Sequence, residues 1–397
     1  MRITKIHTHL LTYEYKPDEV WSWSGGRTLR RNAVFVRIST DSKIEGFGEI
    51  GETAFLPQSV RRIVEEQFVP LLVGEDPLDI ERLWHKMYIR SSHWGRRGVV
   101  IPIISGLDIA LWDIAAKYVK QPLYRILGGA CRDRIRLYAS AGMEQPIPEM
   151  IRDIDSYQQQ GYTAVKIRIG TNFEDDIERI RAIRDRFGSG IDIMTDAGQC
   201  YTDHPWTDFT ALQVARKLEP FDVFWLEEPL HPENIEGFRR LCAGTTVPIA
   251  TGENEFTRFG FQQLLCPRGV DIVQPDVTRS GGISECKKIA AMASAYQLPC
   301  APHVFGSAVG LMANIHFVIS TANCIVLEHD RTVNPLRDTL LTEPLSIEKG
   351  TIGVPKSIGL GVHLEEDIES RYPFIAEGRA VDKESQRRAR LTSWLET

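Results

Sequence analysis

The sequence predicts an α/β protein built on a (β/α) barrel with an additional α+β region, and three observations support this. From about residue 134 onward, short apolar segments typical of strands alternate with segments that have the apolar periodicity of helices. The alternation repeats eight times, which is the number of units in a (β/α)8 barrel. Such a barrel takes about 250 residues, whereas the chain has 397, so a second folded region is expected.

The region before the barrel has a different pattern. Residues 1–60 contain three short segments that are typical of strands. In residues 77–119, apolar residues recur at helical spacing, as Ile80, Leu83 and Trp84 do. Strands followed by helices, without the regular alternation, predict an α+β domain.

These patterns divide the chain into three parts. We predict an α+β domain at 1–128, the barrel at 129–338, and a C-terminal segment at 339–397 that returns to the first domain. The predicted barrel strands are 135–139, 164–169, 191–196, 223–228, 247–253, 272–276, 299–303 and 324–328.

Composition restricts the possible functions. Apolar residues make up 43% of the chain and charged residues 25%, which is typical of a globular protein. The net charge of −6 argues against nucleic-acid binding, which needs a basic face, and no apolar run approaches the 18 or so residues that cross a membrane. The 7 cysteines are scattered, odd in number and without a CxxC pair, so we expect reduced thiols and a cytoplasmic location.

Ionisable residues stand at the carboxyl ends of seven consecutive predicted strands. They are Lys166 and Arg168, Asp196, Glu227 and Glu228, Glu253, Asp276, His303, and Glu328. A single charge at a strand end is common because strands finish at solvent. A complete series is not explained in that way, and active sites of barrels lie at this end, so the series predicts an active site.

Three of these acids predict a metal site. Asp196, Glu227 and Glu253 come from neighbouring strands and would repel one another without a cation. Carboxylate oxygens suit Mg²⁺, which also keeps positions for water or substrate oxygens. Glu228 points to the opposite side of its strand from Glu227, so we expect it to be an ion-pair or hydrogen-bond partner rather than a ligand.

Two further pairs indicate acid–base chemistry. Lys166 and Arg168 are two residues apart and therefore face the same side of the sheet. Asp276 and His303 end adjacent strands. A carboxylate beside an imidazole raises the basicity of the imidazole and fixes its tautomer.

The motifs that contain these residues extend over essentially the whole chain. They are Ser105-Gly-Leu-Asp-Ile-Ala-Leu-Trp-Asp113, Pro122-Leu-Tyr-Arg-Ile-Leu-Gly-Gly129, Lys166-Ile-Arg168, Asp196-Ala-Gly198, Glu227-Glu-Pro229, Gly252-Glu-Asn254, Pro275-Asp276, Gly281-Gly282, Pro302-His303 and Glu328. In combination they resemble the enolase superfamily, in its mandelate racemase-like subgroup. The segments Glu328–Pro335 and Glu343–Leu345 also resemble members that process sugar acids.

The resemblance implies a modified (β/α) TIM barrel closed by a capping domain that is built from the N-terminal region and the C-terminal tail. It implies abstraction of the proton α to a carboxylate, with an ene-diolate stabilised by Mg²⁺. Asp196, Glu227 and Glu253 would hold the metal, and Lys166 would neutralise the substrate carboxylate. A homo-oligomer is also expected.

The resemblance assigns the remaining strand-end residues as well. The His303–Asp276 pair would act as the base, and Glu328 would form a hydrogen bond to the substrate from the far side. Arg168 stands where relatives with two working faces have a second lysine; because arginine stays protonated it is a poor base. One good base favours dehydration over racemisation. Gly198 replaces the asparagine that is frequent in the family.

Substrate contacts are expected from the Trp- and Arg-rich segment 21–31 and from residues beside the strand-end acids. The arginines of this segment, Arg27, Arg30 and Arg31, can bind a distal carboxylate or hydroxyl groups, although a solvated basic loop is the alternative. The predicted contacts are Trp21, Arg27, Arg30, Asn254 and His329.

The sequence thus predicts an Mg²⁺-dependent dehydratase that converts a sugar acid to a 2-keto-3-deoxy acid. The first alternative is a cycloisomerase of a sugar-acid lactone or anhydro sugar acid, and a racemase or epimerase is a further one. A non-catalytic metal-binding relative is the alternative from another class, and the intact acid triad and His303–Asp276 pair argue against it.

Overall fold

The structure is a computed structural model that describes residues 1–23, 25–51, 55–140, 145–378 and 380–382. Its first elements are β1 (Ile3–Glu14), β2 (Trp21–Trp23), β3 (Gly26–Thr28), β4 (Arg30–Thr40), β5 (Glu45–Ile50), α1 (Pro57–Ile63), the π-helical turn η2 (Val64–Phe68), α2 (Val69–Leu72), α3 (Ile80–Ser91), α4 (Val100–Tyr118) and α5 (Leu123–Ile126). The barrel elements are β6 (Arg134–Ser140), α6 (Ile147–Gln159), β7 (Ala164–Arg168), α7 (Phe173–Phe187), η3 (Gly188–Gly190), β8 (Asp192–Asp196), η4 (Gln199–Tyr201), α8 (Asp208–Leu218), η5 (Glu219–Phe221), β9 (Trp225–Glu227), α9 (Ile235–Gly244), β10 (Ile249–Thr251), α10 (Thr257–Leu265), β11 (Ile272–Val273), α11 (Gly282–Ala295), α12 (Ala308–Ile319) and β12 (Leu327–Asp330). The last are α13 (Pro335–Asp338), β13 (Ile347–Glu348), β14 (Thr351–Gly353), α14 (Ile368–Arg371) and β15 (Val381–Asp382).

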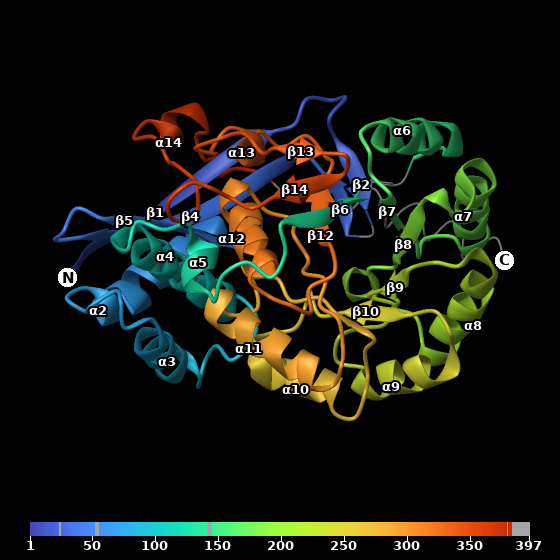
Figure 1. Cartoon of the computed structure of the whole chain (residues 1–397), viewed down its shortest axis with the longest axis horizontal. Coiled ribbons are helices and arrows are strands. Elements are labelled where there is room, and N and C mark those ends of the chain that lie inside the picture. Colours follow the sequence, from blue (N-terminus) through green and yellow to red (C-terminus); the bar gives the residue numbers. More distant parts are fainter. Residues whose placement is uncertain (24, 52–54, 141–144, 379, 383–397) are drawn as a thin grey trace.

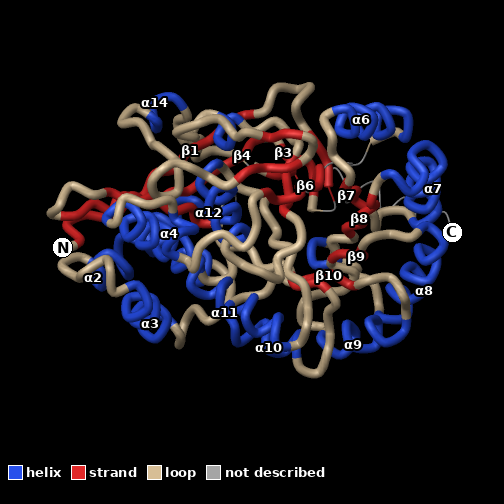
Figure 2. Tube along the Cα trace, viewed as in Figure 1, coloured by secondary structure: helices blue, strands red, loops and turns tan. Residues whose placement is uncertain are grey.

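Two parts lie side by side (Figure 1). The N-terminal sheet with α2, α3 and α4 forms one part, and helices α6 to α10 follow the outer side of the other. Figure 2 shows the barrel strands inside this curved row of helices. Within the described ranges, every helix is too short or too polar to span a membrane.

The N-terminal sheet has the order β1-β4-β5 and is antiparallel. Successive strand residues face opposite sides, so Val34 and Phe35 of β4 are both buried but belong to different cores. Val34 packs with the helical residues of α3 and α4, whereas Phe35 joins the core that continues into the barrel. The sheet is therefore covered on both faces, as a sheet between a helical layer and a second domain must be.

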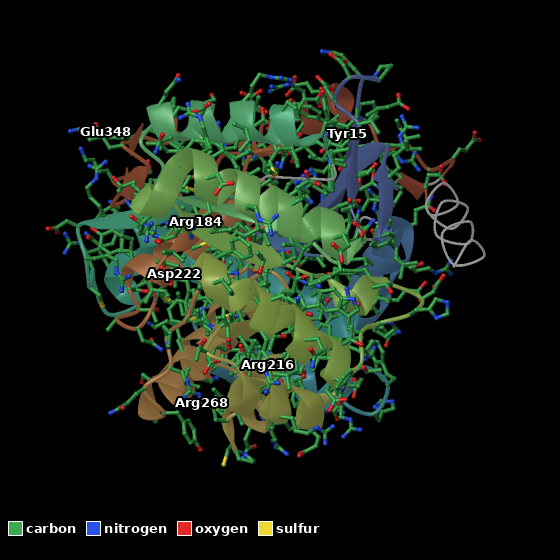
Figure 3. All side chains as sticks on the ribbon, turned by 90° about the vertical axis from the view of Figure 1, so that its right-hand side faces the viewer. Tyr15, Arg184, Arg216, Asp222, Arg268 and Glu348 are labelled. Atoms are coloured by element: carbon green, nitrogen blue, oxygen red, sulfur yellow. The ribbon has the colours of Figure 1, made fainter. Side chains whose placement is uncertain are left out.

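The barrel strands pair in parallel in the order β6-β7-β8-β9-β10-β11. Beyond β11, Val273 bridges Cys300, Cys300 bridges Cys324, and β12 pairs with β6. Hydrogen bonds on the outside of the barrel also connect neighbouring βα units. Arg184 of α7 donates to the carbonyl oxygens of Phe221 and Asp222 at 3.0 and 3.1 Å, on the side of the molecule that Figure 3 faces.

The predicted strand at 299–303 is wrong in its extent, because Cys300 alone pairs there, through isolated bridges to Val273 and Cys324. Pro299 and Pro302 flank the bridge and have no N–H group to donate to a neighbouring strand. The segment nevertheless delivers His303 to the same end of the barrel as the neighbouring strands, so the shortened pairing does not displace the residue.

The motif Ser105–Asp113 lies on α4 and joins the two parts. Asp108 accepts hydrogen bonds from the backbone N–H and hydroxyl of Ser284, at the start of α11. Asp113 accepts from the backbone N–H groups of Phe47 and Leu360 and pairs with Lys117. These carboxylates are fully buried, so each depends on its protein donors, most of which come from other elements.

Two glycines allow α4 to approach the sheet. A Cβ atom at Gly48 would lie 1.8 Å from the carbonyl oxygen of Gly106, and one at Gly106 would lie 2.6 Å from the side chain of Ile50. Any larger residue at either position would push the helix away from β5.

The C-terminal segment contacts both parts. β14 pairs antiparallel with β6 of the barrel, and β15 pairs with β3 of the N-terminal part. Between them, Leu11 of β1 bridges Pro373, and α14 lies beside β1 (Figure 1). The predicted domain boundaries stay predictions, and residues 383–397 of the predicted tail lie outside the described residues.

Replacing Asp113 tests the junction between the two parts. We expect Asp113→Ala to lower the free energy of unfolding by about 3 kcal/mol, because the N–H groups of Phe47 and Leu360 stay buried without an acceptor. Urea denaturation followed by circular dichroism measures the change. The same substitution at exposed Asp185 of α7 is the control, with an expected change within about 0.5 kcal/mol. Equal effects at the two positions would contradict the role of Asp113.

Candidate active site

The predicted strand-end residues meet at the carboxyl end of the barrel. β7 carries Lys166 and ends at Arg168, β8 ends at Asp196, and β9 ends at Glu227. The strands pair in register, with Arg168 opposite Asp196 and Asp196 opposite Glu227, so their last side chains lie at one level.

Asp196, Glu227 and Glu253 form a buried cluster. One carboxylate oxygen from each lies within 4.8 Å of the others. Asp196 Oδ1 and Glu253 Oε2 are buried and have no hydrogen-bond partner within the described part of the chain. Buried oxygens without donors need a positive partner. The oxygen-only donor set therefore fits Mg²⁺.

Lys166 lies among the carboxylates and is completely buried. Its Nζ is 2.7 Å from Glu227 Oε1, 2.8 Å from Glu328 Oε1 and 3.5 Å from Asp196 Oδ2. Burial disfavours the charge on the ammonium group, but the Glu227 and Glu328 carboxylates outweigh burial and hold the pKa of Lys166 well above its usual value. Arg168 pairs with the same oxygen of Asp196. Both cations thus stay charged and neutralise acids of the cluster.

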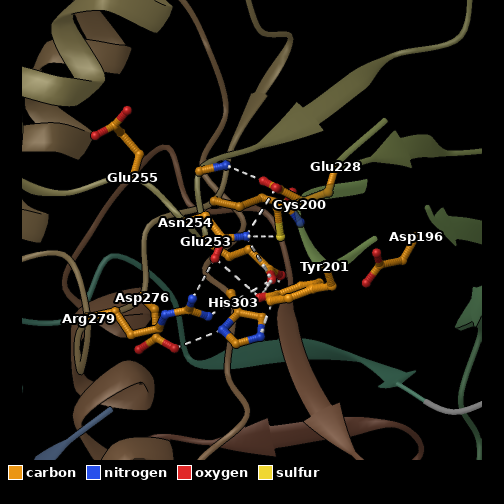
Figure 4. A network of polar contacts seen from close by, with 12 residues as sticks. Asp196, Cys200, Tyr201, Glu228, Glu253, Asn254, Glu255, Asp276, Arg279 and His303 are labelled. Carbon is orange, nitrogen blue, oxygen red and sulfur yellow. Dashed lines mark hydrogen bonds and ion pairs between the residues drawn. The ribbon is translucent and has the colours of Figure 1, made fainter. Parts of the chain in front are cut away.

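His303 lies between Asp276 and Glu253 (Figure 4). Its Nδ1 is 2.8 Å from Asp276 Oδ2, and its Nε2 is 3.6 Å from Glu253 Oε2. Asp276 is held in place through its other oxygen, which accepts from the backbone N–H and the hydroxyl of Thr278 at 2.7 Å each. Asp276 therefore fixes the imidazole with Nε2 directed toward the acid cluster.

The charge environment makes His303 strongly basic. Burial opposes protonation, but Glu253 and the hydrogen bond that His303 donates to Asp276 outweigh burial and raise the pKa of His303 to about 9. Glu328 approaches from the last strand. It accepts from the backbone N–H of Val304 at 2.8 Å, directly after His303, and pairs with Lys166.

Glu228 and Asn254 form a network that joins the triad through Glu253, to which Asn254 Nδ2 donates at 3.4 Å (Figure 4). Glu228 accepts from the backbone N–H of Gly252 at 3.1 Å and from Asn254 Nδ2 at 3.2 Å. Asn254 Oδ1 accepts from Arg279 Nη2 at 2.8 Å. Asn254 thus contacts Glu228 and Arg279, and its role as a substrate contact stays a prediction.

A cavity extends from His303 to the N-terminal part. Barrel residues Arg168, Glu253, Asp276 and His303 line its floor, and the opposite wall contains Trp21, Trp23, Arg30 and Arg31. Aromatic contacts join the two sides: the rings of Trp21 and Phe305 are 5.6 Å apart, and those of Trp23 and Tyr201 are 4.8 Å apart. Both parts of the molecule therefore form the cavity.

The arginines of the wall are held by the protein itself. Arg30 donates to the carbonyl oxygens of Glu377 and Gly378 at 2.7 and 2.5 Å. Arg31 donates to Asp330 Oδ2 at 3.1 Å and lies over the ring of Phe305. Trp21, Arg30 and Arg31 thus line the cavity, and the contacts of Trp21 and Arg30 with substrate stay predictions.

Two predicted contacts lie elsewhere. Arg27 is exposed and is absent from the described lining of the cavity, because it alternates with the buried residues Gly26 and Thr28 on β3. His329 faces away from Glu328 for the same reason. Its Nδ1 is 2.5 Å from the hydroxyl of Tyr162, and burial lowers the pKa of His329 to about 3.

Several lining residues were not among the predicted ones. Tyr201, Phe305, Arg279 and Glu49 all line the cavity. Arg279 lies three residues after Asp276, so it is at the same end of the barrel. This short spacing is a signal from which the sequence alone could have identified it. Glu49 comes from the N-terminal sheet and binds the backbone N–H groups of Ser307 and Gly310, which only the fold brings near it.

Family comparisons cover both parts of the chain. Residues 21–128 match the family described as Mandelate racemase / muconate lactonizing enzyme, N-terminal domain. Residues 149–368 match the family described as Enolase C-terminal domain-like. The second match alone spans more than half of the chain.

Curated relatives are similar over nearly their whole length. D-galactarolactone cycloisomerase from Agrobacterium fabrum is 33% identical over 384 residues, which is 94% of this chain and 99% of the relative. Arabinonate dehydratase from Saccharolobus solfataricus is 36% identical over 377 residues, which is 93% of this chain and 99% of the relative. The relatives are therefore enzymes of sugar-acid chemistry, with two reaction types among them.

Solved structures agree in fold. A member of the enolase superfamily from Polaromonas is 34% identical, with a TM-score of 0.88 over 96% of this chain and 100% of that one. A racemase from Streptomyces coelicolor with bound magnesium is 26% identical, with a TM-score of 0.84 over 93% of this chain and 99% of that one. The chain belongs to the enolase superfamily, in the group of mandelate racemases and muconate lactonizing enzymes.

Proposed function

We propose that this protein is an Mg²⁺-dependent dehydratase of a polyhydroxy carboxylic acid, which removes the proton α to the carboxylate and then water. The observation that carries the proposal is the position of His303, a single basic imidazole directed at a buried triad of acids. Arabinonate dehydratase, a relative at 36% identity, supports the substrate class.

Asp196, Glu227 and Glu253 would hold the metal ion. The two buried oxygens without donors, on Asp196 and Glu253, support this assignment. When bound, Mg²⁺ stabilises the negative charge that develops on the substrate carboxylate as the proton leaves.

Lys166 supplies a second positive charge at the same place. Its ammonium group is buried and fixed between Glu227 and Glu328, so it is oriented before substrate binds. A preorganised charge in a buried site stabilises the carboxylate-derived dianion without reorganising at the moment of reaction.

The neutral form of His303 takes the α-proton on Nε2 as the C–H bond breaks, while Asp276 keeps the proton on Nδ1. The protonated imidazole then returns its proton to the β-hydroxyl, the C–O bond breaks and water leaves. The enol that remains tautomerises to the 2-keto-3-deoxy acid. One group thus performs both proton transfers, which explains why a single base is sufficient.

Arg168 argues against racemisation. A racemase needs a second group that can give up and accept a proton on the opposite face of the substrate. Arg168 pairs with Asp196, and that carboxylate together with Glu253 raises its pKa further above the usual value despite burial. It serves as a fixed cation rather than as a base.

A cycloisomerase is the second candidate, supported by the relative from Agrobacterium fabrum. It would use the same proton abstraction but expel an internal oxygen of a lactone or anhydro sugar acid instead of water. The homo-oligomeric state and the cytoplasmic location stay predictions.

A screen of aldonic and aldaric acids and their lactones, with Mg²⁺ present, tests the reaction. We expect at least one acid to give a 2-keto-3-deoxy acid, detected as its semicarbazone, with loss of one water by mass spectrometry. In D₂O the product should carry deuterium at the carbon that lost the hydroxyl group. Conversion of a lactone or anhydro acid without change of mass would instead establish the cycloisomerase, and turnover without either outcome would contradict both.

Replacing His303 tests the base. We expect His303→Asn to reduce kcat by about 10²–10⁴-fold, because the amide cannot accept the α-proton. Steady-state kinetics on the substrate found in the screen measures the effect, and circular dichroism checks the fold. His363→Asn, at an exposed histidine, is the matched control and should keep full activity. Retention of activity in the first variant would exclude the mechanism.

Metal dependence tests the triad. Dialysis against EDTA should abolish activity, and Mg²⁺ should restore it. Calorimetric titration should give an Mg²⁺ Kd that is raised more than about 10-fold in Glu253→Gln, because one ligand loses its charge. The variant Glu233→Gln, at an exposed carboxylate, should bind as the natural protein does. Unchanged affinity in Glu253→Gln would remove that residue from the metal site.

A further inference from the structure

A second cluster of residues that can bind a metal lies where α14 packs against β1. It consists of His7 and His9 on β1 and Glu369 on α14. The two histidines are two residues apart on one strand, so they face the same side. Glu369 Oε1 is 3.3 Å from His7 Nε2 and 2.9 Å from His9 Nδ1.

These separations fit the edges of a tetrahedral site. Zinc lies about 2.0–2.1 Å from nitrogen and oxygen ligands, so neighbouring ligand atoms in a tetrahedron are about 3.3 Å apart. One nitrogen from each histidine and one oxygen of Glu369 all lie within 4.8 Å of one another. A small inward movement of the exposed side chains is sufficient to bind an ion.

His9 is the buried member of the cluster, at 6% exposed. Its Nδ1 is directed at Glu369 Oε1, and the same oxygen also faces His7. The packing around β1 therefore holds one nitrogen of the cluster in place beside the carboxylate.

A positively charged side chain near the cluster would oppose the binding of a cation. Arg37 stands opposite His7 in the β1–β4 register. Its guanidinium group is directed elsewhere, since it donates to the carbonyl oxygen of Leu364 at 3.3 Å and lies 3.9 Å from the Glu45 carboxylate. A divalent ion between the histidines would also be offset by the negative charge of Glu369.

We propose that His7, His9 and Glu369 form a zinc site that fastens the C-terminal segment to β1. His7 Nε2, His9 Nδ1 and a Glu369 oxygen are the protein ligands. The side chains of His7 and Glu369 are 44% and 45% exposed, so a water molecule has access to the fourth position.

The fastened segment leads directly to the wall of the active-site cavity. After α14, Pro373 bridges Leu11, and the Ile375 N–H donates to the Thr12 hydroxyl at 3.2 Å. The carbonyl oxygens of residues 377 and 378 then hold Arg30, which lines the cavity. Zinc at the cluster therefore stabilises the segment that positions Arg30.

Zinc titration in the presence of saturating Mg²⁺ tests this proposal and does not depend on the proposed function. We use the full-length protein carrying Glu253→Gln, so that zinc binding at the triad is weakened. We expect one zinc ion per chain by calorimetry, and an affinity at least about 10-fold lower after His7→Gln or Glu369→Gln is added. Both added substitutions are at partly exposed side chains, so the fold should persist, and His363→Gln is the matched control.

Limited proteolysis gives an independent measurement. In the protein that carries Glu253→Gln alone, zinc should slow cleavage within residues 365–382 by several-fold. After Glu369→Gln is added, zinc should have no effect on cleavage. Zinc binding that is equally tight in the His7 and Glu369 variants, or the absence of any zinc binding at micromolar concentrations, would overturn the proposal.

Discussion

Asp196, Glu227, Glu253 and Glu328 place four carboxylates in the buried end of one barrel, where like charges repel strongly. Burial is the main reason that the pKa of Glu227 rises to about 8, even with Lys166 beside it, whereas nearby cations hold the pKa of Glu253 and that of Glu328 at about 2. Lys166, Arg168 and His303 therefore offset only part of the negative charge of the cluster. A divalent cation would offset the rest, which makes the acid triad suited to hold a metal ion.

Buried carboxylates are stabilised in a different way where the two parts of the molecule join. Asp108 and Asp113 of α4 are fully buried, and Glu49 of β5 is almost fully buried. Each of these carboxylates accepts hydrogen bonds from backbone N–H groups and does not depend on a lysine or a metal ion alone. Glu49 binds the start of α12, a few residues after His303. The N-terminal part is thereby fixed to the segment that follows His303, the proposed base, and is held against the carboxyl end of the barrel.

The local pattern of the sequence predicts the barrel end well, because strand periodicity and strand-end position are local properties. Lys166, Asp196 and Glu227 are therefore placed together both by the sequence and by the structure. Alternation along the strand also explains why His329 faces away from Glu328, which sequence reasoning alone could have predicted. The pairing of Arg31 with Asp330, in contrast, joins residues 299 positions apart and depends on how the two parts dock. No local pattern contains that information.

The contrast between the barrel end, which local pattern predicts, and the contacts made by docking of the two parts also bears on which reaction such a protein catalyses. Dehydration and cycloisomerisation begin with the same proton abstraction and need the same triad, base and lysine at the barrel end. They differ in which oxygen leaves, and that depends on how the remainder of the substrate is held relative to His303. Cavity residues beyond the strand ends, such as Trp21, Arg31 and Phe305, are where such a difference is expected. Because the guanidinium groups of Arg30 and Arg31 already bind backbone carbonyls and Asp330, this part of the lining presents aromatic faces and oriented donors. Under the proposed function, enzymes with the same barrel end would differ in reaction type through these lining residues, which come from both parts of the molecule.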